Sequence, residues 1–305
     1  MSSDPVRFSG HQSFSLRNTW ITKGVIECAR RPSIFRESDA LVVLGVGKNM
    51  VDAIKYWCLA TRVLEPHDEQ RFDLQPSSIG CLLFGQVGWD PYLEDKATMW
   101  LLHWLLANNK SGATTAYLLF NEFTGQEFGR SELEDWLAVR AASLGAKPAI
   151  STLRRDVGVF LRSYVGGADR HDSSIEDNMD CPLAEIGLIY QDPTRRIYAF
   201  ARGPKDSLPD EVFAFALSDY ARRKERQRTF TFDELAYKAG SPGRIFKLDE
   251  AALAERLDRL AELTDGAWQP TETAGYRQML LSRDVDTRAM LQQYYATRLQ
   301  DVGHA

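Results

Sequence analysis

Cysteine and histidine are scarce in this sequence, and neither is arranged for metal or disulfide chemistry. Four of the 305 residues are cysteine and five are histidine. No two cysteines form a C-x-x-C pair, and the histidines do not have the spacing of zinc ligands. The cysteines are therefore expected to be reduced residues of a cytoplasmic protein, and neither a metal ion nor another cofactor is expected.

Long apolar runs and an overall basic composition are also absent. The longest near-apolar stretch, residues 99–107, is too short to cross a bilayer, so no membrane role is expected. The formal net charge of -5 argues against a protein that is basic all over, so any nucleic-acid contact must depend on a local patch. Residues 1–62 carry nine Lys/Arg against five Asp/Glu, whereas residues 63–130 carry four against nine. Positive charge is therefore concentrated near the start of the chain.

The pattern of residues 38–80 predicts a winged helix-turn-helix. The apolar run 40–44 ends at two glycines, and helical periodicity resumes over residues 48–61. Residues 62–65 and 70–74 then bracket a polar stretch, as the two strands of a wing would. A helix placed in this way presents its N-terminal half to a partner.

The order of helices followed by a strand pair recurs twice along the chain. The second repeat is predicted from helices over residues 115–123, 131–144 and 151–164 and strands over 187–190 and 196–200. The predicted domains are an N-terminal winged-helix unit with a bridging helix (1–110), a second winged-helix-like unit (111–205) and a third with a terminal helix (206–305). The predicted fold is therefore mainly α with short β-hairpins, in which tandem winged helix-turn-helix units are joined by helices.

Basic and polar residues on two predicted helices and the first wing are candidates for contact with duplex DNA. Lys48, Asn49 and Lys55 of the first such helix would enter or flank a major groove, and the arginines would contact phosphates. Alternatively, each of these side chains is exposed and contacts only solvent. The predicted DNA-binding residues are Lys48, Asn49, Lys55, Arg62, Arg71, Arg154, Arg155 and Arg162.

Two segments have some features of catalytic motifs but lack the required context. Residues 44–49 are glycine-rich, yet they lack the preceding glycine and the following hydroxyl of a phosphate-binding loop. Glu94, Asp95 and Lys96, with Asp73 or Asp90, are the residue types of a metal-dependent nuclease, but residues 90–96 look like the opening of a helix, where acids are favoured anyway. No catalytic constellation is convincing, so the protein is not expected to be an enzyme.

Several phrases of the sequence resemble a bacterial family known as domain of unknown function 4007. They are FSGHQSFSLRNTWITKG (8–24), VGKNMV (46–51), DPYLED (90–95), LLHW (101–104) and TLRRDV (152–157), which occur in the family's order. The resemblance implies an accessory role in bacterial anti-phage defence clusters, beside sulfur-transfer enzymes of the DNA-phosphorothioation type. The family signature is matched by Gly10, His11, Phe14, Arg17 and Trp20. Their role is open between a ligand site and a structural tie of the N-terminal segment to the first unit.

These observations favour a DNA-binding accessory component of a bacterial anti-phage defence or DNA-modification system. Its expected partners are double-stranded DNA and other proteins of that system. The alternative is a scaffold that uses its winged-helix units to bind protein, which is a frequent use of that fold. The acidic total charge and the acidic predicted helix 249–263 favour this alternative, because outward carboxylates repel phosphates.

Overall fold

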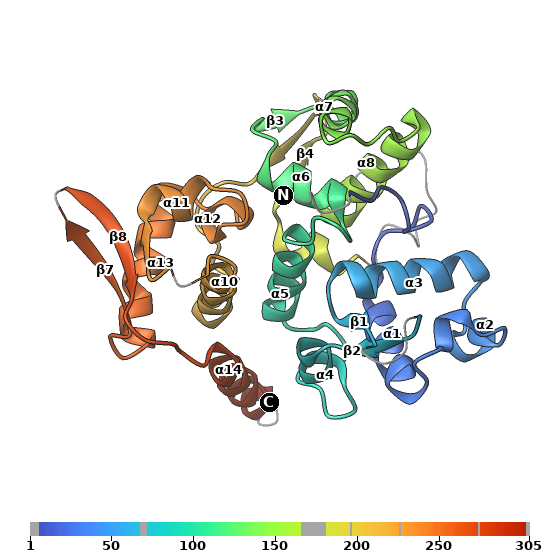
Figure 1. Cartoon of the computed structure of the whole chain (residues 1–305), viewed down its shortest axis with the longest axis horizontal. Helices are drawn as coiled ribbons and strands as arrows, with labels where there is room; N and C mark the ends of the chain where they lie inside the picture. The colour runs from blue at the N-terminus through green and yellow to red at the C-terminus, as the bar shows by residue number, and fades with distance from the viewer. Residues whose placement is uncertain are drawn as a thin grey trace. The chain divides into compact units, whose positions relative to one another are not determined.

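The computed structural model describes residues 6–67, 72–165, 181–195, 197–225, 227–273 and 275–302. The chain divides into two compact bodies, an N-terminal body (Met1–Phe200) and a C-terminal body (Ala201–Ala305). Each is built mainly from helices with small antiparallel sheets (Figure 1). The prediction of helices combined with short antiparallel strand pairs is confirmed at this level. No helix within the described ranges combines the length and the apolar character needed to span a bilayer.

The N-terminal body begins with three α-helices and a two-stranded sheet. In chain order these are α1 (Asn18–Arg30), a 3-10 turn (Ile34–Arg36), α2 (Ala40–Leu44), α3 (Lys48–Ala60), β1 (Leu64–Pro66) and β2 (Leu74–Pro76). Helix α2 ends at Gly45, whose φ of 65° lies in the left-handed region that glycine adopts without steric cost. The chain then turns directly into α3. Helix α1 packs against both α3 and β2, so these elements share one core.

Two helices lead from this first group to the second part of the N-terminal body. They are α4 (Ser78–Phe84) and α5 (Lys96–Ala107). Every residue of α5 from Ala97 onward is buried, and the helix contacts α6 (Thr114–Asn121) and the 3-10 helix η2 (Pro182–Ile186). The fully buried His103 of α5 shares a hydrogen bond of 2.8 Å with the Tyr164 hydroxyl and packs against the Phe120 ring. Helix α5 is therefore a central element of the core of this body.

The rest of the N-terminal body has a three-stranded antiparallel sheet in the order β3-β5-β4. Its remaining elements are β3 (Glu127–Phe128), α7 (Arg130–Ser143), α8 (Ile150–Tyr164), β4 (Ile189–Asp192) and β5 (Ile197–Phe200). Phe128 of β3 lies opposite Tyr198 of β5. From α6 onward, the order is thus helix, strand, helix, helix, strand, strand, with the first strand paired to the last.

The C-terminal body has a similar order of elements, with three helices rather than two between its first two strands and one more helix after the last strand. It contains α10 (Asp210–Arg222), β6 (Thr229–Thr231), α11 (Phe232–Tyr237), α12 (Pro242–Ile245), α13 (Glu250–Leu263), β7 (Trp268–Thr273), β8 (Tyr276–Leu281) and α14 (Thr287–Val302). Its sheet order is β6-β8-β7, so here too the first strand pairs with the last. The two three-stranded sheets therefore have the same topology.

Candidate nucleic-acid interface

Helix α3 exposes its N-terminal half and buries its opposite face. Lys48 and Asn49 open the helix and are exposed, whereas Lys55 is half-buried. On the other side, Ile54 and Trp57 lie in the core. The described part of the chain supplies no ion-pair partner for Lys48 or Lys55, so both ammonium groups remain available to an anionic ligand.

Arg62 lies at the far end of α3 and is directed into the body. Its φ of 55° is in the left-handed region, and its guanidinium donates a hydrogen bond of 2.8 Å to the Asn108 carbonyl at the end of α5. Arg62 is therefore not brought together with Lys48. Arg71, the other predicted phosphate contact of the wing, lies outside the described residues.

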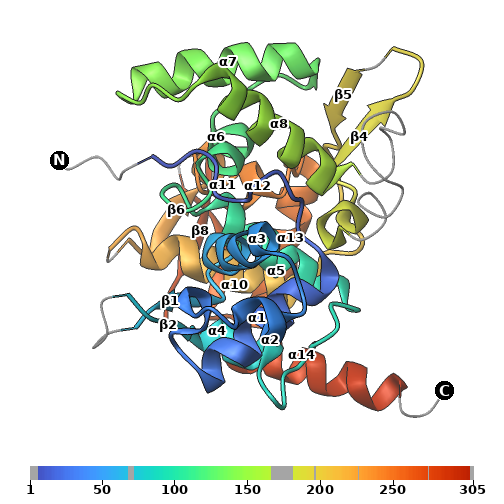
Figure 2. The same ribbon diagram turned by 90° about the vertical axis from the view of Figure 1, so that its right-hand side faces the viewer.

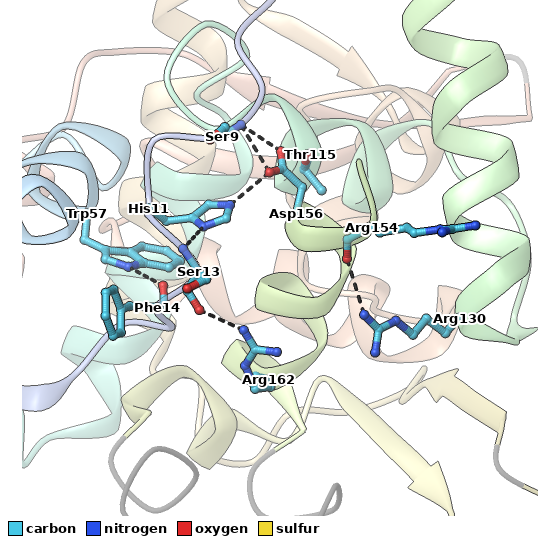
Figure 3. Close-up of polar contacts among 10 residues, drawn as sticks. All are labelled: Ser9, His11, Ser13, Phe14, Trp57, Thr115, Arg130, Arg154, Asp156 and Arg162. Atoms are coloured by element: carbon cyan, nitrogen blue, oxygen red, sulfur yellow. Dashed lines mark hydrogen bonds and ion pairs between the residues drawn. The ribbon is translucent and has the colours of Figure 1, made fainter. Parts of the chain in front are cut away.

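The arginines of α8 lie beside the start of α7. Arg154 and Arg155 are both exposed. The Nε atom of Arg154 lies 3.4 Å from the Glu134 carboxylate, and Arg130 Nε lies 3.1 Å from the same carboxylate. Arg130 also donates to the Arg154 carbonyl at 3.4 Å (Figure 3). Arg130 was not predicted as a candidate, because nothing in its local sequence shows that α7 begins next to α8.

The N-terminal segment, residues 6–17, passes between α3 and α8 (Figure 2). The side-chain amide of Gln12 donates to Asp52 of α3 at 3.3 Å. The Arg162 guanidinium of α8 donates to the Ser13 carbonyl at 2.8 Å (Figure 3). The segment therefore contacts both of the helices that carry the predicted DNA-binding residues.

A buried carboxylate of α8 fixes this segment. Asp156 is 4% exposed, and its oxygens accept hydrogen bonds from the Ser9 N–H at 3.0 and 3.1 Å, from the Thr115 hydroxyl at 2.9 Å and from His11 Nε2 at 3.0 Å. His11 Nδ1 accepts from the Ser13 N–H at 3.2 Å, which assigns the ring proton to Nε2. All the donors are protein groups, so the network satisfies a carboxylate that would otherwise be costly to bury.

Gly10, the signature residue that precedes His11, allows close contact between the segment and α3. Its φ is 113°, and a Cβ placed on it would lie 2.7 Å from the Tyr56 ring. The His11 ring meets the same Tyr56 ring edge-on, with 5.3 Å between the centroids. Burial, followed by the nearby Asp156 carboxylate, raises the pKa of the Tyr56 hydroxyl above its ordinary value. A larger residue at position 10 would displace the segment from α3.

The other three signature residues form a cluster where the segment enters α1. The Phe14 carbonyl accepts a hydrogen bond of 3.1 Å from Trp57 Nε1, and the Phe14 and Trp20 rings pack edge-on at 5.9 Å. The Arg17 guanidinium lies over both rings, 5.9 Å from the Phe14 centroid and 5.3 Å from that of Trp20. These contacts hold the segment against α1 and α3, and Asp156 connects the same segment to α8.

Three of the carboxylates considered for a nuclease site, those of Asp73, Asp90 and Asp95, have partners within the protein. Asp73 pairs with Arg36, and Asp90 accepts hydrogen bonds from the backbone N–H groups of residues 94 and 95 at 2.9 and 3.1 Å. Asp95 caps α5 by accepting from the Ala97 N–H at 2.8 Å. Within the described ranges, no group of three or more His, Cys, Asp or Glu side chains is placed to hold a metal ion.

The buried thiols are poorly suited to nucleophilic chemistry. Burial, followed by the nearby Asp73 carboxylate, raises the pKa of the Cys28 thiol to about 12. Burial likewise raises the pKa of Cys181 to about 12, although hydrogen bonds oppose that shift. Because the thiolate is the reactive form, both groups are inert at neutral pH.

Comparisons with known proteins give a family but no assigned activity. No curated protein matches the chain. Two crystal structures are similar to it, one named "SspB crystal structure" and the other "Magnesium ion-bound SspB crystal structure". Each shows 31% sequence identity and a TM-score of 0.82, and the match covers 92% of this chain and 84% of the other. The family model described as "Protein of unknown function (DUF4007)" matches residues 8–295. As its sequence motifs predicted, the chain belongs to the DUF4007 family.

Proposed function

We propose that the N-terminal body binds duplex DNA through α3 and α8, as an accessory component of a bacterial anti-phage defence or DNA-modification system. The observation that carries the proposal is the succession of α2, a glycine turn, α3 and the β1–β2 pair, with Lys48 and Asn49 exposed at the start of α3. In helix-turn-helix proteins, the N-terminal residues of the second helix contact base edges in the major groove.

The topology of the other segments supports a tandem winged-helix organisation. The sheets β3-β5-β4 and β6-β8-β7 share one topology, and in each, helices lie between the first strand and the closing strand pair. In that succession, α8 takes the place that α3 has in the first segment. Arg154 and Arg155 are exposed in the first half of α8, as a phosphate-contacting residue would need to be.

Membership of the family and the SspB-named structures support the role in a DNA-modification system. The motifs that this chain shares with the family point to gene clusters with phosphorothioation-type sulfur-transfer enzymes. The proposed role is binding rather than catalysis. Because the net charge is -5, we expect few phosphate contacts, a modest affinity and a clear dependence on salt.

The test is binding of the full chain to a fluorescent duplex of about 30 base pairs at about 50 and 200 mM salt. The first pair of variants is Lys48→Glu/Lys55→Glu and Arg154→Glu/Arg155→Glu. The matched control is Arg277→Glu/Arg288→Glu, which changes the net charge equally at exposed positions of the C-terminal body. Salt-dependent binding that is lost in either of the first variants but kept in the control supports the proposal. Absence of binding at the lower salt concentration contradicts it.

The acidic surface of α13 favours a second candidate, a protein-binding role for the C-terminal body. Four carboxylates, those of Glu250, Glu255, Asp258 and Glu262, are exposed along this helix. Helix α13 has the same place in its segment as α8, but its charges would repel a phosphate backbone. If the duplex does not bind, the scaffold alternative becomes the favoured function.

A further inference from the structure

The C-terminal body has a groove between α13 and the β7–β8 hairpin, which we call the α13 groove. It encloses about 200 Å³, and its apolar lining comes from Phe232, Ala254, Leu257 and Pro270. Helix α13 packs against β7, so the helix and the strand form its two walls (Figure 1). Pockets for drug-sized ligands measure about 300–1,000 Å³. The α13 groove is too small for such a ligand but has room for an apolar side chain of a protein.

Carboxylates without a partner lie at the rim of the α13 groove. Asp258 of α13 and Glu272 of β7 line the groove, and both residues are exposed. Glu262, one turn beyond Asp258 on α13, is exposed as well. Within the described ranges, these three carboxylates accept no hydrogen bond and form no ion pair. Among the residues that line the groove, Arg277 of β8 is the one cation, so negative charge prevails there.

The place of these carboxylates on α13 costs helix stability. The C-terminal end of a helix carries a partial negative charge, which favours cations and disfavours Asp and Glu in the last turn. Glu262 lies in the last turn of α13, and that turn has no basic residue. Arg259, the nearest arginine in the sequence, pairs with Asp210 and Glu255 instead. Local helix stability therefore does not account for the acidic end of α13, whereas a cationic partner would.

The strand wall of the groove does not favour the addition of another strand. β7 is an edge strand, because the sheet order is β6-β8-β7. Pro270 in this strand has no N–H, and proline on an edge strand is one of the ways in which proteins block pairing with a further strand. The contacts of a docked segment must therefore come from its side chains rather than from main-chain hydrogen bonds.

We propose that the α13 groove binds a segment of a partner protein that carries an apolar side chain flanked by lysine or arginine. The apolar side chain would lie between α13 and β7, and the cations would lie beside Asp258 and Glu272. Charge complementarity identifies this class of partner, since the same carboxylates would repel a phosphate backbone. The inference rests on the protein-binding role of the C-terminal body, the second candidate function above, and does not depend on DNA binding by the N-terminal body.

The test measures binding of the full chain to synthetic labelled peptides by fluorescence anisotropy. The first peptide has about 14 residues, with leucines on one face of a helix and lysines on the other, and is used at about 50 mM salt. A second peptide has glutamate in place of lysine, and a third has serine in place of leucine. These two peptides separate the need for cations from the need for apolar side chains.

Two variants separate the charge of the groove from its shape. Asp258→Lys/Glu272→Lys reverses the charge of the rim, whereas Ala254→Phe fills the groove and changes no charge. The matched control is Asp206→Lys/Glu225→Lys, which changes the net charge equally at two exposed carboxylates of the C-terminal body that do not line the groove. Thermal unfolding of each variant shows whether it is folded.

We expect the leucine–lysine peptide to bind the wild type, and to bind the control variant within about twofold of it. Each of the two groove variants should bind this peptide about tenfold more weakly, and the wild type should bind the glutamate and serine peptides that weakly too. If the wild type does not bind the leucine–lysine peptide, or if the folded groove variants bind it as well as the wild type does, the proposed role of the α13 groove is wrong.

Two further measurements identify other occupants of the groove. In sedimentation experiments, a concentration-dependent dimer that Ala254→Phe abolishes would place a second copy of the chain in the groove and overturn the proposal. The fluorescent duplex should bind Ala254→Phe and the wild type equally, and its loss in this variant would assign the groove to nucleic acid instead. Peptide binding without duplex binding would support the groove and contradict the DNA-binding function. Duplex binding without peptide binding would do the reverse.

Discussion

Replacement of Asp156 by asparagine tests how strongly the N-terminal segment is held between α3 and α8. The substitution keeps the size of the side chain but turns one acceptor oxygen into an NH2 donor. At the Oδ1 position that donor would face the His11 Nε2–H, and at the Oδ2 position it would face the Thr115 hydroxyl, which can accept from it only by turning its own proton away. In either orientation at least one buried donor loses Asp156 as its acceptor, and the others lose a charged partner.

The magnitude follows from the number and burial of these bonds. A hydrogen bond to a charged group is worth about 1.5–3 kcal/mol, and a buried unsatisfied donor costs about 1–3 kcal/mol. We therefore expect Asp156→Asn to lower the free energy of unfolding by about 3–5 kcal/mol, close to the cost of breaking a buried charged pair. For a body of about 200 residues, that corresponds to a fall in the thermal midpoint of about 6–20 °C.

Tryptophan fluorescence is a suitable probe, because six of the seven tryptophans lie within residues 1–200. Thr115→Val removes a single bond to the carboxylate and should cost about 1.5–3 kcal/mol, at the lower end of the range for Asp156→Asn or below it. Asp192→Asn is the matched control, since Asp192 also accepts three hydrogen bonds, from Thr194 and Arg195, but is only half-buried, at the β4–β5 turn. A midpoint for Asp156→Asn as high as that of Asp192→Asn would refute the reasoning.

Three further predictions concern the backbone, the pH dependence and the thiols. Gly10→Ala should lower the free energy of unfolding by about 1–3 kcal/mol, because the left-handed φ of 113° is strained for alanine and the Cβ would contact the Tyr56 ring; thermal unfolding measures it. Burial lowers the pKa of Lys205 from 10.5 to about 8, so the unfolded chain binds more protons between these values, and stability should rise with pH across that window. Chemical unfolding at several pH values should show this rise to be larger in the wild type than in Lys205→Met, and equal slopes would contradict it. Of the four cysteines, Cys81 is exposed, so a thiol reagent should label one site quickly at about pH 8, and Cys81→Ser should abolish that fast phase. Fast labelling of the buried Cys28 instead would be incompatible with its raised pKa.

Local sequence signals were sufficient for the longer helices of the chain. The predicted helix 48–61 corresponds to α3 (Lys48–Ala60), and the predicted helices 131–144 and 151–164 correspond to α7 and α8 within one residue at each end. Apolar residues at helical spacing determine these elements, and the information lies within each segment. Short strands are less well encoded, since β3 has only two residues and exists through its pairing with β5.

The candidate site was only partly predictable, because exposure and direction depend on distant parts of the chain. The exposure of Lys48 follows from the periodicity of α3, whereas the left-handed backbone of Arg62 and its bond to Asn108 have no local signal. Asp156 lies within one of the family motifs, yet its partner His11 is 145 residues away in sequence. Sequence reasoning therefore identified the motifs but not the bond that joins them.

The contacts of the N-terminal segment have a consequence for how α3 and α8 would bind one ligand. Gln12 contacts α3, while Ser9, His11 and Ser13 are held by side chains of α8. The segment thus ties the two helices into a single body and limits their movement relative to each other. When two binding surfaces are held in this way, contact by the first makes contact by the second effectively intramolecular. Consider a duplex long enough to reach both helices. Charge reversal on either helix alone should then lower the affinity to the weak affinity that the other helix has by itself. A duplex that reaches only one helix should respond to the variants of that helix and not to those of the other.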